Sequence, residues 1–143
     1  MNRKQDPRHL PSYLEGLNNK QLEAVLHEGS PLLILAGAGS GKTRVITTKI
    51  AYLVDKKGID PRSILAVTFT NKAAREMEGR VRDMTEASAG VMVRTFHSFG
   101  AWFLRRNAAL AGLKEGFTIY DEDDSLALLS LIEKGLTKKE LAP

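Results

Sequence analysis

Residues 35–43, LAGAGSGKT, combine residue types and a spacing that can bind phosphate. Glycines alternate with small residues here, so successive backbone N–H groups can turn inward where a side chain would block an anion. Lys42 supplies a cation within reach of the β- and γ-phosphates of a nucleoside triphosphate, and Thr43 supplies a hydroxyl for Mg²⁺. An apolar run precedes this loop and a helical pattern follows it, which is the context that a phosphate loop requires. We predict that the loop binds a nucleoside triphosphate and that Lys42 and Thr43 are its catalytic residues.

The usual phosphate-loop pattern, G-x-x-x-x-G-K-[ST], has glycine where this chain has Ala36. That position precedes the tight turn and needs only a small residue, so alanine is compatible with the prediction. The alternative is a glycine-rich turn between strand and helix without a ligand. The predicted nucleotide-binding residues of the loop are Ala36, Gly37, Ala38, Gly39, Ser40, Gly41, Lys42, Thr43 and Arg44.

Apolar runs and helical periods alternate along the chain around this loop. Strands are predicted at 32–35, 64–68 and 91–94, and a fourth short apolar run lies at 117–120. Helices are predicted at 18–27, 43–57 and 71–84, then around 99–103 and 126–132, the last ended by Gly135. Strands and helices that alternate at this spacing are typical of an α/β fold with a mainly parallel sheet.

Helical spacing also predicts which side chains face a core. One stripe on the helix at 43–57 contains Val45, Ile46, Ile50, Leu53 and Val54. A second stripe, on the helix at 71–84, contains Ala74, Met77, Val81 and Met84. Trp102 and Phe103 are interpreted as core residues, and Arg105 and Arg106 as a solvated face.

Four segments together resemble the first motifs of superfamily 1 DNA helicases of the UvrD/Rep/PcrA group, in order and in spacing. They are LNNKQLEAV at 17–25, the loop and its helix at 35–53, ILAVTFTNKAAREMEGRV at 64–81 and VRTFHSF at 93–99. Alanine at the first loop position is usual in that group. The resemblance implies a P-loop NTPase of the RecA-like type, a three-layer sandwich that is incomplete in this chain. It also implies an ATP-dependent DNA helicase that uses ATP and Mg²⁺ to move along single-stranded DNA and unwind duplexes, in repair or replication.

The resemblance assigns adenine binding to Gln21. Asn18 with Gln21 three residues later is also a variant capping box, so the local alternative is a helix cap, and one residue could serve both roles. The expected partners are single-stranded DNA, duplex junctions and the remainder of the same chain.

Single-stranded DNA contacts are implied at the ends of two predicted strands. The residues are Thr68, Phe69, Thr70, Asn71, Thr95 and His97. An aromatic face, hydroxyls and an amide suit base stacking and phosphate contacts. The alternative is ordinary structure, in which Thr70 or Asn71 caps the next helix, Phe69 is buried and His97 packs or caps.

An acid-rich segment, IYDEDDS at 119–125, looks like a strand that ends in metal-binding carboxylates. We interpret it instead as a helix start, because Asp121 is a good N-cap and the apolar stretch LALLSLI follows. In the family a similar helix start lies just before an inserted second domain. The predicted organisation is an N-terminal arm at 1–16, the N-terminal part of a RecA-like domain (1A) at 17–120 and the start of a helical domain (1B) at 121–143. Thr137–Glu140 and Pro143 resemble the openings of further helices, so we expect the chain to continue and the fragment to be inactive alone.

Composition excludes several classes of protein. The 143 residues carry a net charge of +4 and no cysteine, which excludes disulfides and thiolate metal sites. No apolar run approaches the length of a membrane span, and residues 1–10 lack the apolar core of a signal peptide. The absence of cysteine fits a cytoplasmic protein, and we expect one without a membrane partner. Two other functions stay open: a subunit of a RecB/AddA-type helicase–nuclease, and a stand-alone nucleotide-binding module that unwinds nothing.

Overall fold

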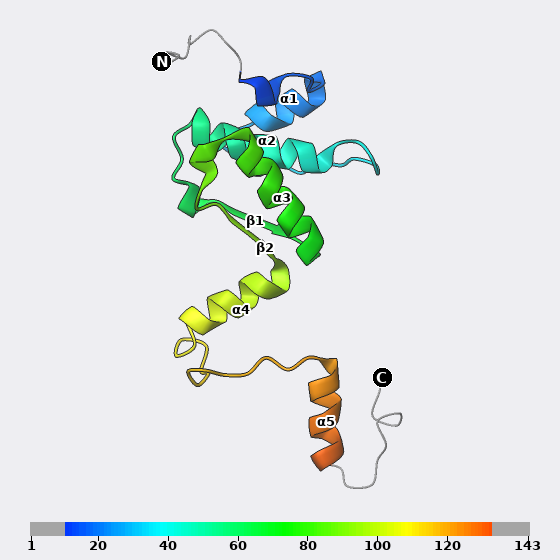
Figure 1. Cartoon of the computed structure of the whole chain (residues 1–143), viewed down its shortest axis with the longest axis vertical. Coiled ribbons are helices and arrows are strands. Elements are labelled where there is room, and N and C mark those ends of the chain that lie inside the picture. Colours follow the sequence, from blue (N-terminus) through cyan, green and yellow to red (C-terminus); the bar gives the residue numbers. More distant parts are fainter. Residues whose placement is uncertain (1–10, 133–143) are drawn as a thin grey trace. The chain divides into compact units, whose positions relative to one another are not determined.

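The computed structural model describes residues 11–132, which divide into two compact units after Phe96. In the first unit the elements are α1 (Asn19–Leu26), α2 (Lys42–Asp55), β1 (Leu65–Thr68), α3 (Asn71–Met84) and β2 (Met92–Thr95) (Figure 1). Short 3₁₀ turns are η1 (Ser12–Leu14), η2 (Pro61–Ser63) and η3 (Glu86–Ser88). The second unit follows with α4 (Phe96–Arg106), whose first residue closes the first unit, and α5 (Glu122–Ile132).

The sheet consists of β1 and β2, which run parallel and are joined through α3. The register places Leu65 opposite Met92 and Thr68 opposite Thr95, so both strands end at the same edge. This confirms the α/β class and the parallel pairing of the second and third predicted strands. It also places the residues that follow the two strands next to each other.

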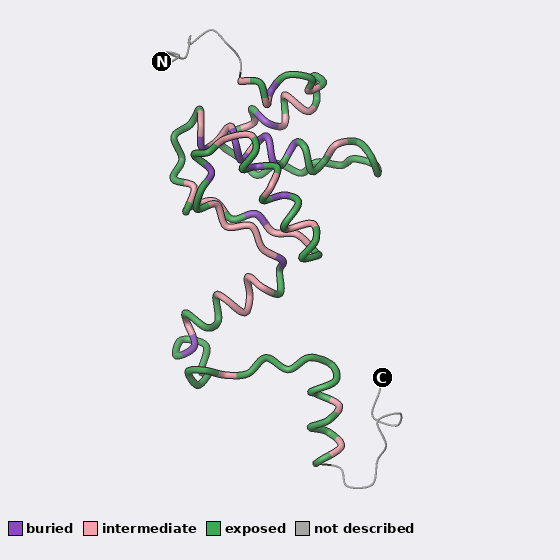
Figure 2. Tube along the Cα trace, in the orientation of Figure 1, coloured by how far each residue is buried: buried purple, intermediate pink, exposed green. Residues whose placement is uncertain are grey.

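Two apolar clusters hold the first unit together, and Figure 2 shows its buried positions along α1, α2, α3 and the sheet. The first consists of Ile50 from α2, Ala66 from β1, and Met77 and Val81 from α3. The second consists of Leu14, Val25 and Val45, which join η1, α1 and α2. Full burial of each large side chain contributes about 1.5–3 kcal/mol. The stripe predicted for α3 is therefore confirmed at Met77 and Val81, and residue 14 of the predicted arm packs against α1 and α2.

The strand predicted at 32–35 is wrong for this structure. The segment is irregular and its side chains are exposed, Leu33 to 80% and Leu35 to 87%. A strand needs a neighbour that takes up its backbone hydrogen bonds, and the only sheet within residues 11–132 pairs β1 with β2. The apolar run at 117–120 likewise forms no strand. An apolar segment therefore does not form a strand here unless a neighbouring strand accepts and donates its backbone hydrogen bonds.

Two predictions of buried side chains also fail. Ile46 is 42% exposed, because Thr47 and Thr48 occupy the buried side of α2, each at 0% exposure. The Thr47 hydroxyl donates to the Thr43 carbonyl at 3.0 Å, which satisfies a buried polar group within the helix. In the second unit, Phe103 is 49% exposed rather than core.

Residues 97–132 have little core of their own. Among them only Ala108 is buried, and Trp102 is half-buried against the ring of Phe99. Several apolar residues of α5 are exposed, Leu131 to 73% and Ile132 to 68%. The predicted features at Gly135, Thr137–Glu140 and Pro143, and residues 1–10 of the predicted arm, lie outside the described residues.

The start of α5 confirms the helix interpretation of the acid-rich segment. The Asp124 N–H donates to Asp121 Oδ1 at 2.8 Å, and the Ser125 hydroxyl donates to the Asp121 carbonyl at 2.8 Å. Asp121 is therefore a helix cap, as its position before an apolar helical stretch predicts. None of the helices between residues 11 and 132 is both long and apolar enough to cross a membrane.

Candidate nucleotide-binding site

The glycine-rich loop closes on itself around the carbonyl of Gly37. This carbonyl accepts hydrogen bonds from the Ser40 hydroxyl at 2.8 Å and from the Ser40 N–H at 3.4 Å. Gly39 and Gly41 have φ of 74° and 85°, a region in which other residues are strained. The loop therefore needs glycine at both positions to turn into α2.

The N-terminus of α2 is open to an anion. Its N-cap is Gly41, no side chain accepts a hydrogen bond there, and no acidic residue lies in the first turn. The first N–H groups of a helix have no partner inside the helix and carry a partial positive charge. A helix of 14 residues with such a start is a ready phosphate site.

Lys42 places its ammonium group at the loop. Its Nζ donates to the carbonyl of Ala36 at 2.9 Å and to that of Gly37 at 2.6 Å. Both carbonyls belong to the loop that would surround a phosphate. Thr43 follows on the exposed side of α2. The predicted catalytic pair, Lys42 and Thr43, thus forms the first two residues of α2, and Lys42 reaches back to the loop.

Gln21 links α1 to the loop through both ends of its amide group. Its side-chain Oε1 accepts from the Asn18 backbone N–H at 3.0 Å. The Gln21 backbone N–H in turn donates to Asn18 Oδ1 at 2.9 Å, so the predicted capping box is present. In addition, Gln21 Nε2 donates to the Ser40 carbonyl at 3.0 Å. A Cβ on Gly41 would lie 2.8 Å from this nitrogen, so the close approach requires glycine. The cap and the loop contact use the same side chain at the same time.

A cavity of about 200 Å³ lies between α1 and the loop. Its apolar lining comes mainly from Ala24, Ile34, Leu35 and Val45, and its polar lining includes Gln21, Ser40 and Lys42. Apolar walls with a few directed polar groups are typical of small-molecule sites. The cavity brings together Gln21 and the phosphate loop, which are distant in sequence.

Three polar contacts fasten α1 and η1 to α2 and so hold Gln21 over the loop. Lys49 Nζ donates to the carbonyls of Val25, at 2.8 Å, and His27, at the end of α1. Tyr13 donates its hydroxyl to Asp55 at 2.7 Å. The third contact is from Arg44, whose Nη2 donates to the Glu15 carbonyl at 2.8 Å. Arg44, predicted as a nucleotide ligand, therefore holds the preceding segment in this structure.

Burial shifts the pKa of two of the side chains that make these contacts, Lys49 and Tyr13. It lowers the pKa of the Lys49 ammonium. It also raises the pKa of the Tyr13 hydroxyl, an effect that the hydrogen bond to Asp55 reinforces. Sequence analysis missed both residues, because a lysine or a tyrosine within a helical pattern gives no signal of a distant carbonyl or carboxylate partner.

The residues predicted to contact DNA divide between the two units. Thr68 and Thr95 lie opposite each other at the sheet edge, and Thr95 is buried. Phe69 is 87% exposed, so the alternative that it is buried is wrong. Thr70 caps α3 through its hydroxyl, which accepts from the Ala73 N–H at 3.1 Å, while Asn71 is exposed. His97 is exposed within the second unit.

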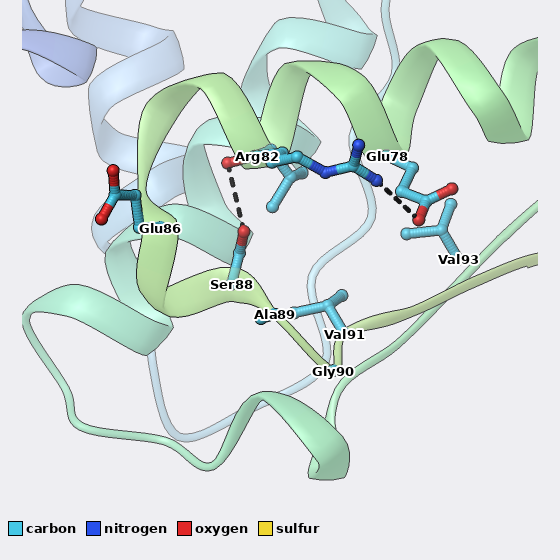
Figure 3. A pocket seen from close by; sticks show the side chains of 9 residues that line it. Glu78, Arg82, Glu86, Ser88, Ala89, Gly90, Val91 and Val93 are labelled. Carbon is cyan, nitrogen blue, oxygen red and sulfur yellow. Dashed lines mark hydrogen bonds and ion pairs between the residues drawn. The ribbon is translucent and has the colours of Figure 1, made fainter.

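A second cavity, of about 290 Å³, lies between the end of α3, η3 and the start of β2 (Figure 3). Arg82 and Glu78 form an ion pair at 3.0 Å on its rim, and Val81, Val91 and Val93 contribute apolar lining. None of the predicted site residues lines it. It lacks the glycine loop and the open helix N-terminus, so the smaller cavity is the candidate nucleotide site.

The described residues contain no cluster of metal-binding side chains. Within residues 11–132 no three or more His, Cys, Asp or Glu side chains gather into a group that could hold a metal ion.

Comparison with known proteins agrees with this geometry. The family model described as the UvrD/REP helicase N-terminal domain matches residues 17–142. The chain belongs to the UvrD/REP helicase family. The match covers α1 and the phosphate loop, which line the cavity, and it also covers β1 and β2.

Relatives within this family are named as helicases. The chain is 53% identical over 134 residues to the ATP-dependent DNA helicase UvrD1 of Mycobacterium tuberculosis, an alignment that covers 91% of the chain and 17% of the relative. It is 48% identical over 122 residues to the ATP-dependent DNA helicase PcrA of Staphylococcus epidermidis, with 85% and 17% covered. It is 53% identical over 117 residues to a probable DNA helicase II homolog of Mycoplasma capricolum, with 81% and 16% covered. The chain thus spans about one sixth of the length of these relatives.

Proposed function

We propose that this chain forms the N-terminal part of the ATP-binding motor domain of an ATP-dependent DNA helicase. The observation that carries the proposal is the joint placement of Gln21, Lys42 and the open N-terminus of α2 around one cavity. The relatives' names support the same activity. In the complete protein, ATP hydrolysis drives translocation along single-stranded DNA and unwinding of duplexes, in repair or replication.

Each residue of the loop has a role that follows from its geometry. The N–H groups at the start of α2 hold phosphate oxygens, and Lys42 leaves its two loop carbonyls to neutralise the terminal phosphates. Thr43 offers its hydroxyl to Mg²⁺, which neutralises charge on the phosphates when bound. We expect the carboxylates that complete the metal site from the remainder of the complete protein, since the chain spans 17% of the length of its relative.

Gln21 recognises the base. Its Oε1 and Nε2 each keep one hydrogen-bonding position free beyond the contacts with Asn18 and Ser40. Those contacts fix which end of the amide is the donor. The free acceptor and donor lie side by side and match N6 and N7 of adenine, a pattern that glutamine recognises in a bidentate manner. ATP is therefore preferred over GTP.

The exposed segment 32–35 becomes a central strand of a larger sheet in the complete protein. Its apolar side chains and unpaired backbone suit a strand between neighbours supplied by the rest of a longer polypeptide. A RecA-like three-layer sandwich results, with residues 17–120 in its 1A part and 121–143 at the start of an inserted helical domain 1B. The alternatives are a RecB/AddA-type helicase–nuclease and a module that binds nucleotide without unwinding.

DNA-stimulated ATP hydrolysis by the full-length protein tests the proposal. We expect single-stranded DNA to raise the rate, and Asn71→Ala to raise the half-saturating DNA concentration several-fold through loss of one polar contact, about 1 kcal/mol. Lys57→Ala is a matched control, because Lys57 pairs with Glu28 away from the sheet edge. A full-length protein that binds ATP but whose hydrolysis ignores DNA would favour the stand-alone module. A nuclease domain in the same polypeptide would favour the helicase–nuclease.

A further inference from the structure

The helix that carries Gln21 has no cation of its own at its C-terminus. The last turn of α1 contains no basic residue, although the last carbonyls of a helix have no partner within it and carry partial negative charge. A helix of eight residues is also too short to be stable alone in water. The position of Gln21 over the loop therefore depends on contacts that other elements make with α1.

Lys49 of α2 supplies the missing cation. Its ammonium donates to the carbonyls of Val25, at 2.8 Å, and of His27, the C-cap residue of α1. Val45 lies one turn earlier on α2 and belongs to the same apolar cluster as the fully buried Val25 side chain. Since residues four apart share one face of a helix, Val45 and Lys49 together hold Val25, one by its side chain and the other by its carbonyl.

The other two polar contacts in this region hold the segment before α1. Tyr13 lies in η1 and Glu15 directly follows it, so the bonds that they make to α2 act before the helix begins. Arg44, the donor to Glu15, is also a predicted nucleotide ligand and would have to exchange that carbonyl for the nucleotide. Of the three contacts, the one from Lys49 acts on α1 itself, which packs against α2 (Figure 1).

The geometry separates Lys49 from the groups that would bind phosphate. It lies two turns further along α2 than Lys42, about 10 Å at 1.5 Å of rise per residue. It does not line the cavity between α1 and the loop. Val25, however, is one turn after Gln21 on the same short helix. Displacement of α1 at Val25 would therefore displace Gln21 and leave the loop and the start of α2 in place.

We infer that Lys49 is a positioning residue for recognition of the base: it holds α1 so that Gln21 reaches adenine, and it takes no part in binding the phosphates. This inference rests on the proposed function and adds a residue to it. The loss of Lys49 should therefore weaken the contacts to the base and spare those to the phosphates, an unequal effect that a general loss of stability would not produce.

The affinities of the full-length protein for ATP, GTP and inorganic tripolyphosphate, which has no base, test the inference. Lys49→Met keeps the length of the side chain and removes its charge. We expect it to weaken ATP binding roughly tenfold, as for the loss of one bidentate contact to a base, and to reduce the preference for ATP over GTP. The affinity for tripolyphosphate should stay the same. Lys49→Arg keeps a cation that can donate to both carbonyls and is expected to restore ATP binding and the preference.

Lys57→Met is the matched control. Lys57 pairs with Glu28, just after α1, but both residues are exposed, and exposed ion pairs contribute little. This variant should keep all three affinities. If Lys49→Met does not fold, Lys49→Gln takes its place, since glutamine keeps one donor, and it should show the same unequal loss at a smaller size.

The outcomes keep the inference and the proposed function apart. Equal losses for ATP and tripolyphosphate would reduce Lys49 to a residue that supports the fold, and an unaltered ATP affinity would mean that it does not position Gln21. Either result overturns the inference while the proposed function stands. A parent protein that binds neither ATP nor tripolyphosphate would overturn the proposed function itself.

Discussion

The N-termini of α2 and α5 have a similar place in the sequence pattern but differ in their capping groups and in the charge of their first turns. Each follows a short apolar run that forms no strand, at 32–35 and 117–120, and each opens a helix of at least 11 residues. At α2 the N-cap is Gly41, without a side-chain acceptor and without an acid in the first turn. At α5, Asp121 accepts the Asp124 N–H, and all three acids of the first turn follow it.

The difference shows what converts a helix start into a phosphate site. Both helices present N–H groups that need an acceptor and a positive end of the helix dipole. In α5 the protein supplies the acceptor and the negative charge itself, so an external anion gains little. In α2 it supplies neither and adds the ammonium of Lys42 beside the loop. The side chains around the N-cap, and not the fold, decide whether the free N–H groups of the first turn are available to an external anion.

Removal of the cation at α2 is the largest test of this difference. Lys42→Ala is expected to weaken ATP binding by the chain roughly a hundredfold, because a charge-assisted hydrogen bond to phosphate contributes about 3 kcal/mol. Isothermal titration with ATP measures the change. Lys56→Ala, at the other end of α2, is the control and should leave the affinity as it is. Equal ATP affinity in the Lys42 variant and the parent chain would remove the phosphate-loop assignment.

A smaller effect is expected from Gly41→Ala, which alters the open N-cap without removing a charge. The new Cβ would meet Gln21 Nε2 at 2.8 Å, and φ of 85° is strained for alanine. The strain costs about 1–2 kcal/mol of stability, and displacement of Gln21 should lower ATP affinity roughly tenfold.

Gly58→Ala separates the two causes, because Gly58 also has positive φ, 64°, but has no atom near the added Cβ. Urea unfolding should show a comparable loss of stability in both variants. Only Gly41→Ala should also lose ATP affinity. A parallel loss of affinity in Gly58→Ala would mean that stability, and not the position of Gln21, controls binding.

Local patterns predicted the parts of the site that depend on neighbouring residues. The glycine spacing gave the loop, Asn18 and Gln21 gave the capping box, and Asp121 gave the start of α5. Each of these features is satisfied within a few residues along the chain. The parallel pairing of β1 with β2 followed from the order of strand and helix.

Features that need distant partners escaped sequence analysis. The run at 32–35 is more apolar than β1, yet only β1 finds a neighbouring strand within residues 11–132. The bond from Gln21 to the Ser40 carbonyl joins residues 19 positions apart. The Phe69–Phe96 contact depends on the register of two strands. In each case the outcome depends on which distant segments pack together. The periodicity within one segment carries no information about that.

The smallest expected effect concerns the acids of α5. If Asp121 is only a cap, Asp121→Asn should leave the helix nearly as stable, because asparagine caps as well as aspartate does. Asp121→Ala removes the acceptor of the Asp124 N–H and should cost about 1 kcal/mol of helix stability, seen as roughly fivefold faster amide exchange in α5.

Neither Asp121 variant should change ATP affinity or the Mg²⁺-dependent ATPase of the full-length protein. A metal ligand would behave differently, since asparagine lacks the negative charge that Mg²⁺ favours. A hundredfold fall in ATPase rate for Asp121→Asn, with amide exchange unchanged, would make this acid-rich segment part of the metal site. The N-termini of α2 and α5 would then both belong to the ATP site, and the proposed difference between them would be wrong.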